Sequence, residues 1–201
     1  MTVQYHSGVP PRPPQFTTRR RAELFDRLVE LFLAEGFAHL TLDEIASRLR
    51  CSKSTLYTLA GSKEQLVQAA TVHFFRNAAV AVEEKIADVT GPRERITAYL
   101  AAVGVVLGDA SEQFMEDLDG FPPAREVYER NTEIAADRVN ELITDGVAGG
   151  VFRDVHAAFA ADLAATMMVR IQQRAVHAKT GLDDAQSYRE LAAILTSGIS
   201  V

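Results

Sequence analysis

A short basic segment rich in side-chain hydroxyl groups lies near the N-terminus of a chain that is acidic overall. The formal net charge of the 201 residues is -6, yet no Asp or Glu lies between Glu44 and Glu64. Cations and hydroxyl groups donate hydrogen bonds to phosphate oxygens and to base edges, so this composition indicates contact with a nucleic acid. The side chains concerned are Arg48, Arg50, Ser52, Lys53, Ser54, Thr55, Tyr57 and Lys63.

The charge is divided unevenly along the chain. Residues 1–63 contain nine Lys or Arg and six Asp or Glu, whereas residues 64–201 contain twelve and twenty-one. A basic N-terminal part on an acidic body is typical of a protein that contacts a polyanion at one end. A small imbalance of this kind also arises by chance, so charge alone does not decide between the two interpretations.

The apolar residues around the basic segment follow helical spacing. A first helix is expected from about residue 18 to residue 35, with Gly36 as its C-terminal cap. Thr41 and Glu44 have the spacing of a capping box, and Ser52 is placed to cap another short helix. Two short helices that pack on a third form a helix-turn-helix, whose second helix enters the DNA major groove.

The rest of the chain is also helical in pattern, without the alternation that marks a sheet. Four prolines within residues 1–16 predict a disordered arm. We expect about nine helices in all, and thus an all-α fold. The later ones are a helix opened by a Ser62–Gln65 capping box and ending near Val89, helices at about 92–108, 111–118 and 124–145, one from the cap Asp154 to about Ala178, and one from the cap Asp183 to about Ser197.

A longer pattern covers residues 17–66. Its elements are Gly36-Phe37, Thr41, Ile45-Ala46, Ser52, Leu56-Tyr57 and Ser62-Lys63-Glu64-Gln65-Leu66. In order, spacing and residue type this pattern resembles the DNA-binding domain of the TetR (tetracycline-repressor) family of transcriptional regulators. The resemblance implies a helix-turn-helix domain at residues 17–63, with its motif at about 41–60, and a larger ligand-binding and dimerisation domain at residues 64–201.

The resemblance also implies roles for single residues. Tyr57, Lys63 and Thr41 match phosphate-contacting positions, although an aromatic such as Tyr57 could instead pack on the first helix. Lys53 matches a base-reading position and is expected at a guanine edge. The other DNA contacts that the resemblance implies are the neighbouring base readers Ser52, Ser54 and Thr55, and the basic residues Arg19, Arg20 and Arg21 at the start of the first helix.

Two departures from the family pattern lie beside these residues. The turn of the helix-turn-helix usually holds Gly, and Arg50 stands there. A positive φ at Arg50 would cost about 1 kcal/mol, which a phosphate contact could offset. The aromatic-Pro pair that usually precedes the long helix is replaced by Ala60-Gly61, which we expect to act either as a flexible joint or as an ordinary loop.

The resemblance implies a function as a sequence-specific transcriptional regulator, most often a repressor that a small, largely apolar ligand releases from its operator. A cavity between long helices, lined by Met and aromatic residues, suits such a ligand, although these residues are usually plain core. The expected lining residues are His73, Phe74, Tyr99, Val103, Phe114, Met115, Phe121, Tyr128, Met167, Met168 and Ile171.

A homodimer through the last two predicted helices is expected as well. Both helices carry small or apolar residues at close spacing, which favours an isologous four-helix interface. A two-fold dimer requires a palindromic operator, with its recognition helices about 34–36 Å apart. The residues that predict this interface are Ala157, Ala161, Ala164, Ala165, Leu191, Ala192, Ile194 and Leu195.

The motifs for other functions are missing from the sequence. Scattered histidines without metal-ligand spacing predict neither a metal site nor a cofactor, and no nucleophile stands near Asp154, His156 and Asp162. Cys51 is expected to pack in the turn, with a redox role as the alternative. We predict a cytoplasmic protein without a signal peptide or membrane span. An all-α enzyme or a helical adaptor without DNA binding is the alternative function.

Overall fold

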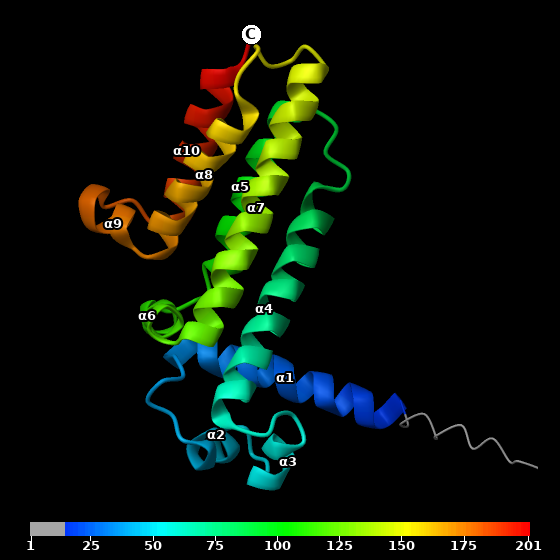
Figure 1. Ribbon diagram of the computed structural model, residues 1–201, viewed down its shortest axis with the longest axis vertical. Coiled ribbons are helices and arrows are strands. Elements are labelled where there is room, and N and C mark those ends of the chain that lie inside the picture. The colour runs from blue at the N-terminus through cyan, green and yellow to red at the C-terminus, as the bar shows by residue number, and fades with distance from the viewer. Residues whose placement is uncertain (1–14) are drawn as a thin grey trace, which may run out of the picture.

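The computed structural model describes residues 15–201, and these residues form ten α-helices without a named strand (Figure 1). The predicted all-α class is therefore confirmed, with one helix more than expected. The helices are α1 (Gln15–Glu35), α2 (Leu42–Arg48), α3 (Lys53–Tyr57), α4 (Lys63–Ile86), α5 (Pro92–Leu107), α6 (Glu112–Gly120), α7 (Pro122–Ala148), α8 (Ala157–Gln172), α9 (Ala175–Thr180) and α10 (Asp184–Ile199).

The first three helices form a small unit at one end of the molecule (Figure 1). Its core is apolar and includes Leu28 and Phe32 of α1, Ile45 of α2 and Leu56 of α3, each at most 2% exposed. Helices of five and seven residues are unstable alone, so α2 and α3 depend on this packing. The unit has the arrangement of a helix-turn-helix, as predicted.

The long helix α4 begins in this unit and runs along the larger bundle (Figure 1). The bundle is built from α5, α7, α8 and α10, with α5 packed between α4 and α10 and α7 packed on α8. Its core is continuous and contains the fully buried Ile96, Leu100, Val139 and Ile143. Gly104 lets α5 approach α10 closely, because a Cβ there would lie 2.8 Å from the Tyr188 ring.

Most of the predicted helix starts are confirmed. Thr41 caps α2 in a full capping box, Ser52 caps α3, Ser111 caps α6, and Asp183 caps α10. Pro92 stands in the first turn of α5, as expected. The Ser62–Gln65 box is only half formed, since the Gln65 side chain accepts from the Gly61 N–H at 3.0 Å rather than from Ser62.

The predicted helix from Asp154 to Ala178 is wrong at both ends. His156 rather than Asp154 caps α8, because its ring Nδ1 accepts from the Phe159 N–H at 3.2 Å. The chain breaks after Gln172, where Arg174 takes a left-handed φ of 58°, and α9 then starts separately. Left-handed backbone cannot continue an α-helix, which explains the additional helix.

We predicted a disordered arm at residues 1–16. Residues 1–14 of this arm lie outside the described part of the chain. Gln15 and Phe16 belong to α1, so the prediction is wrong for these two residues. None of the helices within residues 15–201 combines the length and the apolar composition that crossing a membrane requires.

Candidate functional site

A cluster of hydroxyl groups forms the start of α3, the predicted recognition helix. The Ser52 Oγ accepts from the Thr55 N–H at 3.1 Å and lies 2.7 Å from the Ser54 Oγ and 2.8 Å from the Thr55 Oγ1. Ser52 and Ser54 are exposed, whereas Thr55 is half-buried. The structure therefore brings three predicted base-reading residues together, with Ser52 also serving as the helix cap.

Lys53 is exposed on the first turn of α3 and forms an ion pair with α2. Its Nζ lies 2.9 Å from the Asp43 Oδ2, and this hydrogen bond raises the pKa of the Lys53 ammonium group. Asp43 lies just before the segment without acidic residues, so the charge pattern along the sequence did not predict the ion pair between Lys53 and Asp43. Any acceptor that binds this ammonium group would have to compete with Asp43.

The turn between α2 and α3 holds Arg50 in a left-handed conformation with a φ of 51°. The Arg50 side chain is exposed beside the hydroxyl cluster. The strained backbone that we expected if Arg replaces the usual Gly is thus present. Cys51, the next residue, is half-buried, and burial raises the pKa of its thiol, which favours packing over thiolate chemistry.

Lys63, at the start of α4, is tied to the turn between α1 and α2. Its Nζ donates to the Ala38 carbonyl at 2.8 Å. The N–H groups of Phe37 and Ala38 in turn donate to the Asp117 Oδ2 at 2.5 and 2.7 Å, and Asp117 belongs to α6. This carboxylate is only 6% exposed, so a buried acidic group joins the helix-turn-helix unit to the larger bundle.

The remaining predicted DNA contacts lie on the same small unit. Tyr57 on α3 is 49% exposed, which argues against a role in the core. Thr41 caps α2, and its hydroxyl donates to the Glu44 Oε2 at 2.8 Å. Arg19, Arg20 and Arg21 are exposed on α1, and the Arg21 Nη2 lies 3.4 Å from the Leu59 carbonyl just beyond α3.

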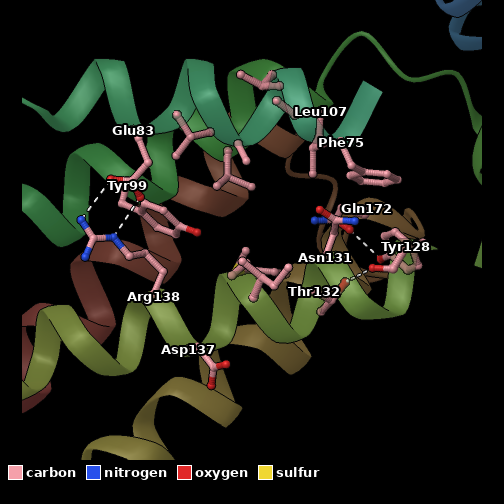
Figure 2. A pocket seen from close by; sticks show the side chains of 18 of the residues that line it. Phe75, Glu83, Tyr99, Leu107, Tyr128, Asn131, Thr132, Asp137, Arg138 and Gln172 are labelled. Carbon is pink, nitrogen blue, oxygen red and sulfur yellow. Dashed lines mark hydrogen bonds and ion pairs between the residues drawn. The ribbon is translucent and has the colours of Figure 1, made fainter. Parts of the chain in front are cut away.

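A cavity of about 410 Å³ lies in the larger bundle, between α4, α5, α7 and α8 (Figure 2). This volume falls within the range of small-molecule sites. Its exposed lining residues, among them Glu83, Ile134 and Glu141, belong to α4 and α7 and mark the side on which it opens. The wall is mainly apolar and includes Phe75, Ala78, Val82, Val103, Val106, Leu107, Ala135 and Met168.

Polar groups line the cavity at two ends (Figure 2). At one end the Tyr128 hydroxyl donates to the Gln172 Oε1 at 2.5 Å, and the Gln172 Nε2 donates to the Tyr188 hydroxyl at 2.9 Å. At the other end Arg138 forms two hydrogen bonds with Glu83, of 2.8 and 3.0 Å, close to Tyr99. Burial raises the pKa of both Tyr99 and Tyr128 to about 12, so both hydroxyls remain protonated at neutral pH.

Four of the predicted ligand-binding residues line this cavity, namely Tyr99, Val103, Tyr128 and Met168. The others lie elsewhere. His73 lies 2.8 Å from the Asp26 Oδ1 and stacks on Phe25, which ties α4 to α1 instead. Phe74, Phe114, Met115 and Phe121 pack in the core that α1, α4 and α6 share, and Met167 and Ile171 belong to the packing of the bundle core.

The polar lining was not predicted from the sequence. Arg138, Glu83 and Glu141 read as ordinary charges on exposed helix faces. Gln172 gave the one usable pattern, because it follows Ala161, Ala165 and Met168 on a buried stripe. A polar residue at a buried helical position needs partners, and partners of this kind often line a site. Within residues 15–201, no three His, Cys, Asp or Glu side chains are arranged to hold a metal ion.

Residues 24–70 match the family model for bacterial regulatory proteins of the tetR family. The match covers most of the helix-turn-helix unit, from within α1 through α2 and α3, and the first part of α4. No curated protein matches the chain.

Solved structures match the chain over nearly its whole length. A transcriptional regulator from Saccharomonospora viridis, solved in complex with choline, has a TM-score of 0.76 at 18% identity, over 92% of this chain and 99% of that one. A TetR-family regulator from Cytophaga hutchinsonii has a TM-score of 0.74 at 17% sequence identity, and the match covers 94% of this chain and 99% of that one. A TetR-family regulator from Agrobacterium tumefaciens has a TM-score of 0.72 at 14% sequence identity, and the match covers 92% of this chain and 99% of that one. At these identities the similarity establishes the fold.

Proposed function

We propose that this chain, which belongs to the TetR family of bacterial transcriptional regulators, is a repressor that a small ligand releases from its operator. The observation that carries the proposal is the course of α4. This single helix starts with Lys63 beside the helix-turn-helix and carries Phe75, Val82 and Glu83 into the cavity wall. A ligand that displaces α4 in the bundle therefore acts on the DNA-binding unit.

The DNA-binding part of the proposal is supported by the exposed surface of α3. Hydroxyl groups, Lys53, Arg50 and Tyr57 face solvent there, in a unit whose own core is formed by other residues. Such groups donate to phosphate oxygens and base edges. The ligand-binding part is supported by the cavity and by the choline that the S. viridis neighbour binds in its crystal structure.

Exposed apolar side chains on α8 and α10 support a homodimer. Phe159 and Leu163 of α8 are 68% and 54% exposed, and Ile194 of α10 is 71% exposed. Five of the residues that predicted the interface are instead buried in the core of the subunit, namely Ala161, Ala164, Ala165, Ala192 and Leu195. We therefore infer that the larger residues form the dimer contact, with the help of the partly exposed Ala157 and Leu191.

Binding to the DNA that flanks the protein's own gene tests the proposal. Gel-shift titration should give a sequence-specific complex that weakens steeply as salt is raised. A DNA of scrambled sequence and equal length serves as the control. Equal affinity for the two DNAs at moderate salt would overturn the proposed function, whatever the protein binds in its cavity.

A further inference from the structure

The hydroxyl of Tyr99 lies at the cavity and has no hydrogen-bond partner among the described residues. Tyr99 is 6% exposed, and no hydrogen bond to its hydroxyl occurs within residues 15–201. Figure 2 shows this hydroxyl pointing from α5 into the middle of the cavity. A tyrosine hydroxyl has one O–H to donate, and no protein acceptor takes it here, so it is available to a molecule held in the cavity.

The guanidinium group of Arg138, which lines the cavity, already forms ion pairs with two carboxylates. Arg138 is the one Lys or Arg among the described residues that line the cavity. Its Nε and Nη2 donate to the two carboxylate oxygens of Glu83, and its Nη1 donates to the Glu141 Oε2 at 2.8 Å. An anionic ligand would have to displace one of these carboxylates, and it would meet more negative than positive charge.

A cationic ligand finds no free carboxylate inside the cavity either. Both oxygens of Glu83 accept from Arg138. Glu141 is mostly exposed, and Figure 2 shows Asp137 directed away from the cavity. Exposed carboxylates are screened by water and contribute little to binding a cation. The groups that remain for a ligand are uncharged. They are the apolar side chains, the Tyr99 hydroxyl, and Asn131 and Thr132, which already donate to backbone carbonyls of α7.

We propose that the ligand of this cavity is an uncharged, largely apolar molecule with a carbonyl or hydroxyl oxygen that accepts a hydrogen bond from Tyr99. The apolar part of the molecule lies against Phe75, Val103, Leu107 and Met168, which provide the wall beyond this hydroxyl. The inference deepens the proposed function and rests on its statement that this cavity is the effector site.

Three probes of equal chain length and different charge test the ligand class. Calorimetric titration of the full chain with 2-decanone, decanoate and decyltrimethylammonium, each below its critical micelle concentration, gives three affinities. The ketone should bind at least tenfold more tightly than either ion. Equal or tighter binding of one of the ions would overturn the proposal, and so would the absence of measurable binding by the ketone.

Two sets of substitutions test the residues. Tyr99→Phe removes only the hydroxyl, so it should weaken ketone binding about 2- to 13-fold, the range expected for one hydrogen bond, and leave decyltrimethylammonium binding unchanged. The double variant Glu83→Gln, Glu141→Gln releases Arg138 and should strengthen decanoate binding about tenfold or more. Unchanged ketone affinity in Tyr99→Phe would overturn the assignment of the hydroxyl.

The two proposals fail in different ways. Operator binding by the ligand-free protein does not depend on the charge of the cavity. A protein that binds its operator specifically but prefers decanoate would refute the ligand class and leave the proposed function standing. A protein that binds the ketone through Tyr99 but shows no preference among DNAs would refute the proposed function alone.

Discussion

Two lysines of the DNA-binding unit have different partners, and this difference predicts different defects when each is removed. Lys63 donates one hydrogen bond to the Ala38 carbonyl, which leaves two ammonium protons for a phosphate. Lys63→Ala should therefore weaken binding to all DNAs alike and lower the salt slope by about 1 per subunit. Lys53 lies on α3 among the expected base readers, so Lys53→Ala should cost about 1–3 kcal/mol on the operator only.

Gel-shift titration at several salt concentrations, with the operator and a scrambled DNA, distinguishes the two lysine variants. Lys85→Ala provides a matched control, because Lys85 is exposed in the last turn of the same helix as Lys63. If Lys53→Ala and Lys63→Ala lose affinity equally on both DNAs, the assignment of separate roles is incorrect.

Arg50 combines a strained backbone with a position on the proposed DNA surface. Glycine adopts its φ of 51° without steric cost, so Arg50→Gly should raise the free energy of unfolding by about 1 kcal/mol. The same change removes a cation and should weaken DNA binding. Urea denaturation followed by circular dichroism, together with a gel shift, measures both effects. A variant that loses stability would show that the Arg50 side chain itself stabilises the turn.

At the level of the helices, the buried carboxylate of Asp117 joins α6 to the turn between α1 and α2. Replacing it with Ala leaves the buried Phe37 N–H without an acceptor, which costs about 1–3 kcal/mol. Asp117→Ala should therefore destabilise the protein by this amount, and Asp117→Asn by less, since an amide oxygen still accepts.

Asp119→Ala is the control for the Asp117 variants, because Asp119 is an exposed acidic residue on the same helix. Urea denaturation at one fixed protein concentration gives the comparison, since the stability of an oligomer depends on concentration. Similar free energies of unfolding for Asp117→Ala and Asp119→Ala would contradict the structural role of the buried carboxylate.

The helices themselves were largely predictable, because local rules determine where they start. Thr41, Ser52 and Asp183 cap helices in the structure as their spacing predicts. The break at Arg174 was not predictable, since no Gly or Pro stands between Gln172 and α9 and the turn depends on contacts with α10. The Arg174 Nη1, for example, lies 2.7 Å from the Asp184 Oδ1.

The candidate sites differ in how far the sequence predicted them. The proposed DNA contacts lie within residues 41–63, apart from the three arginines at the start of α1, so a local pattern contains most of them. The cavity is formed by residues from four helices, and its polar members pair across helices, as Arg138 does with Glu83. Helical spacing predicts which residues share a face of one helix. It does not predict which faces of two helices pack together, and for this reason seven of the predicted lining residues lie outside the cavity.

In the whole molecule, the exposed apolar residues of α8 and α10 allow the proposed dimer to be tested. Phe159→Asp or Ile194→Asp would place a charge in the proposed contact and should give a monomer at micromolar concentration, with weakened operator binding. Light scattering coupled to size-exclusion chromatography measures the mass. Val72→Asp, at a 48% exposed valine of α4, is the matched control. Dimers formed by both test variants would place the interface on another surface.

The Ala60-Gly61 segment joins α3 to α4. We propose that a ligand in the cavity changes DNA affinity by bending the chain at this joint. The Gly61 N–H donates to the Gln65 Oε1 at 3.0 Å, and Gly61 is not in the left-handed region, so proline is the change that restricts it most. A ligand can release DNA only if it binds a second state of the dimer, with its recognition helices further apart, better than it binds the DNA-bound state. If Gly61 bends in that transition, Gly61→Pro should leave the dimer folded and reduce the ligand's effect on operator affinity.

The control for Gly61→Pro is Gly61→Ala, which keeps the N–H and brings a Cβ only against the mobile end of the Gln65 side chain. Operator affinity is measured for the wild type and both variants, with and without a saturating ligand that titration has shown to occupy the cavity. The ratio of the two affinities should fall in Gly61→Pro and stay near the wild-type value in Gly61→Ala. An unchanged ratio in both would exclude this joint. The contacts of α6 with the turn between α1 and α2, through Asp117, would then be the next route to test, because they join the same two units without passing through Gly61.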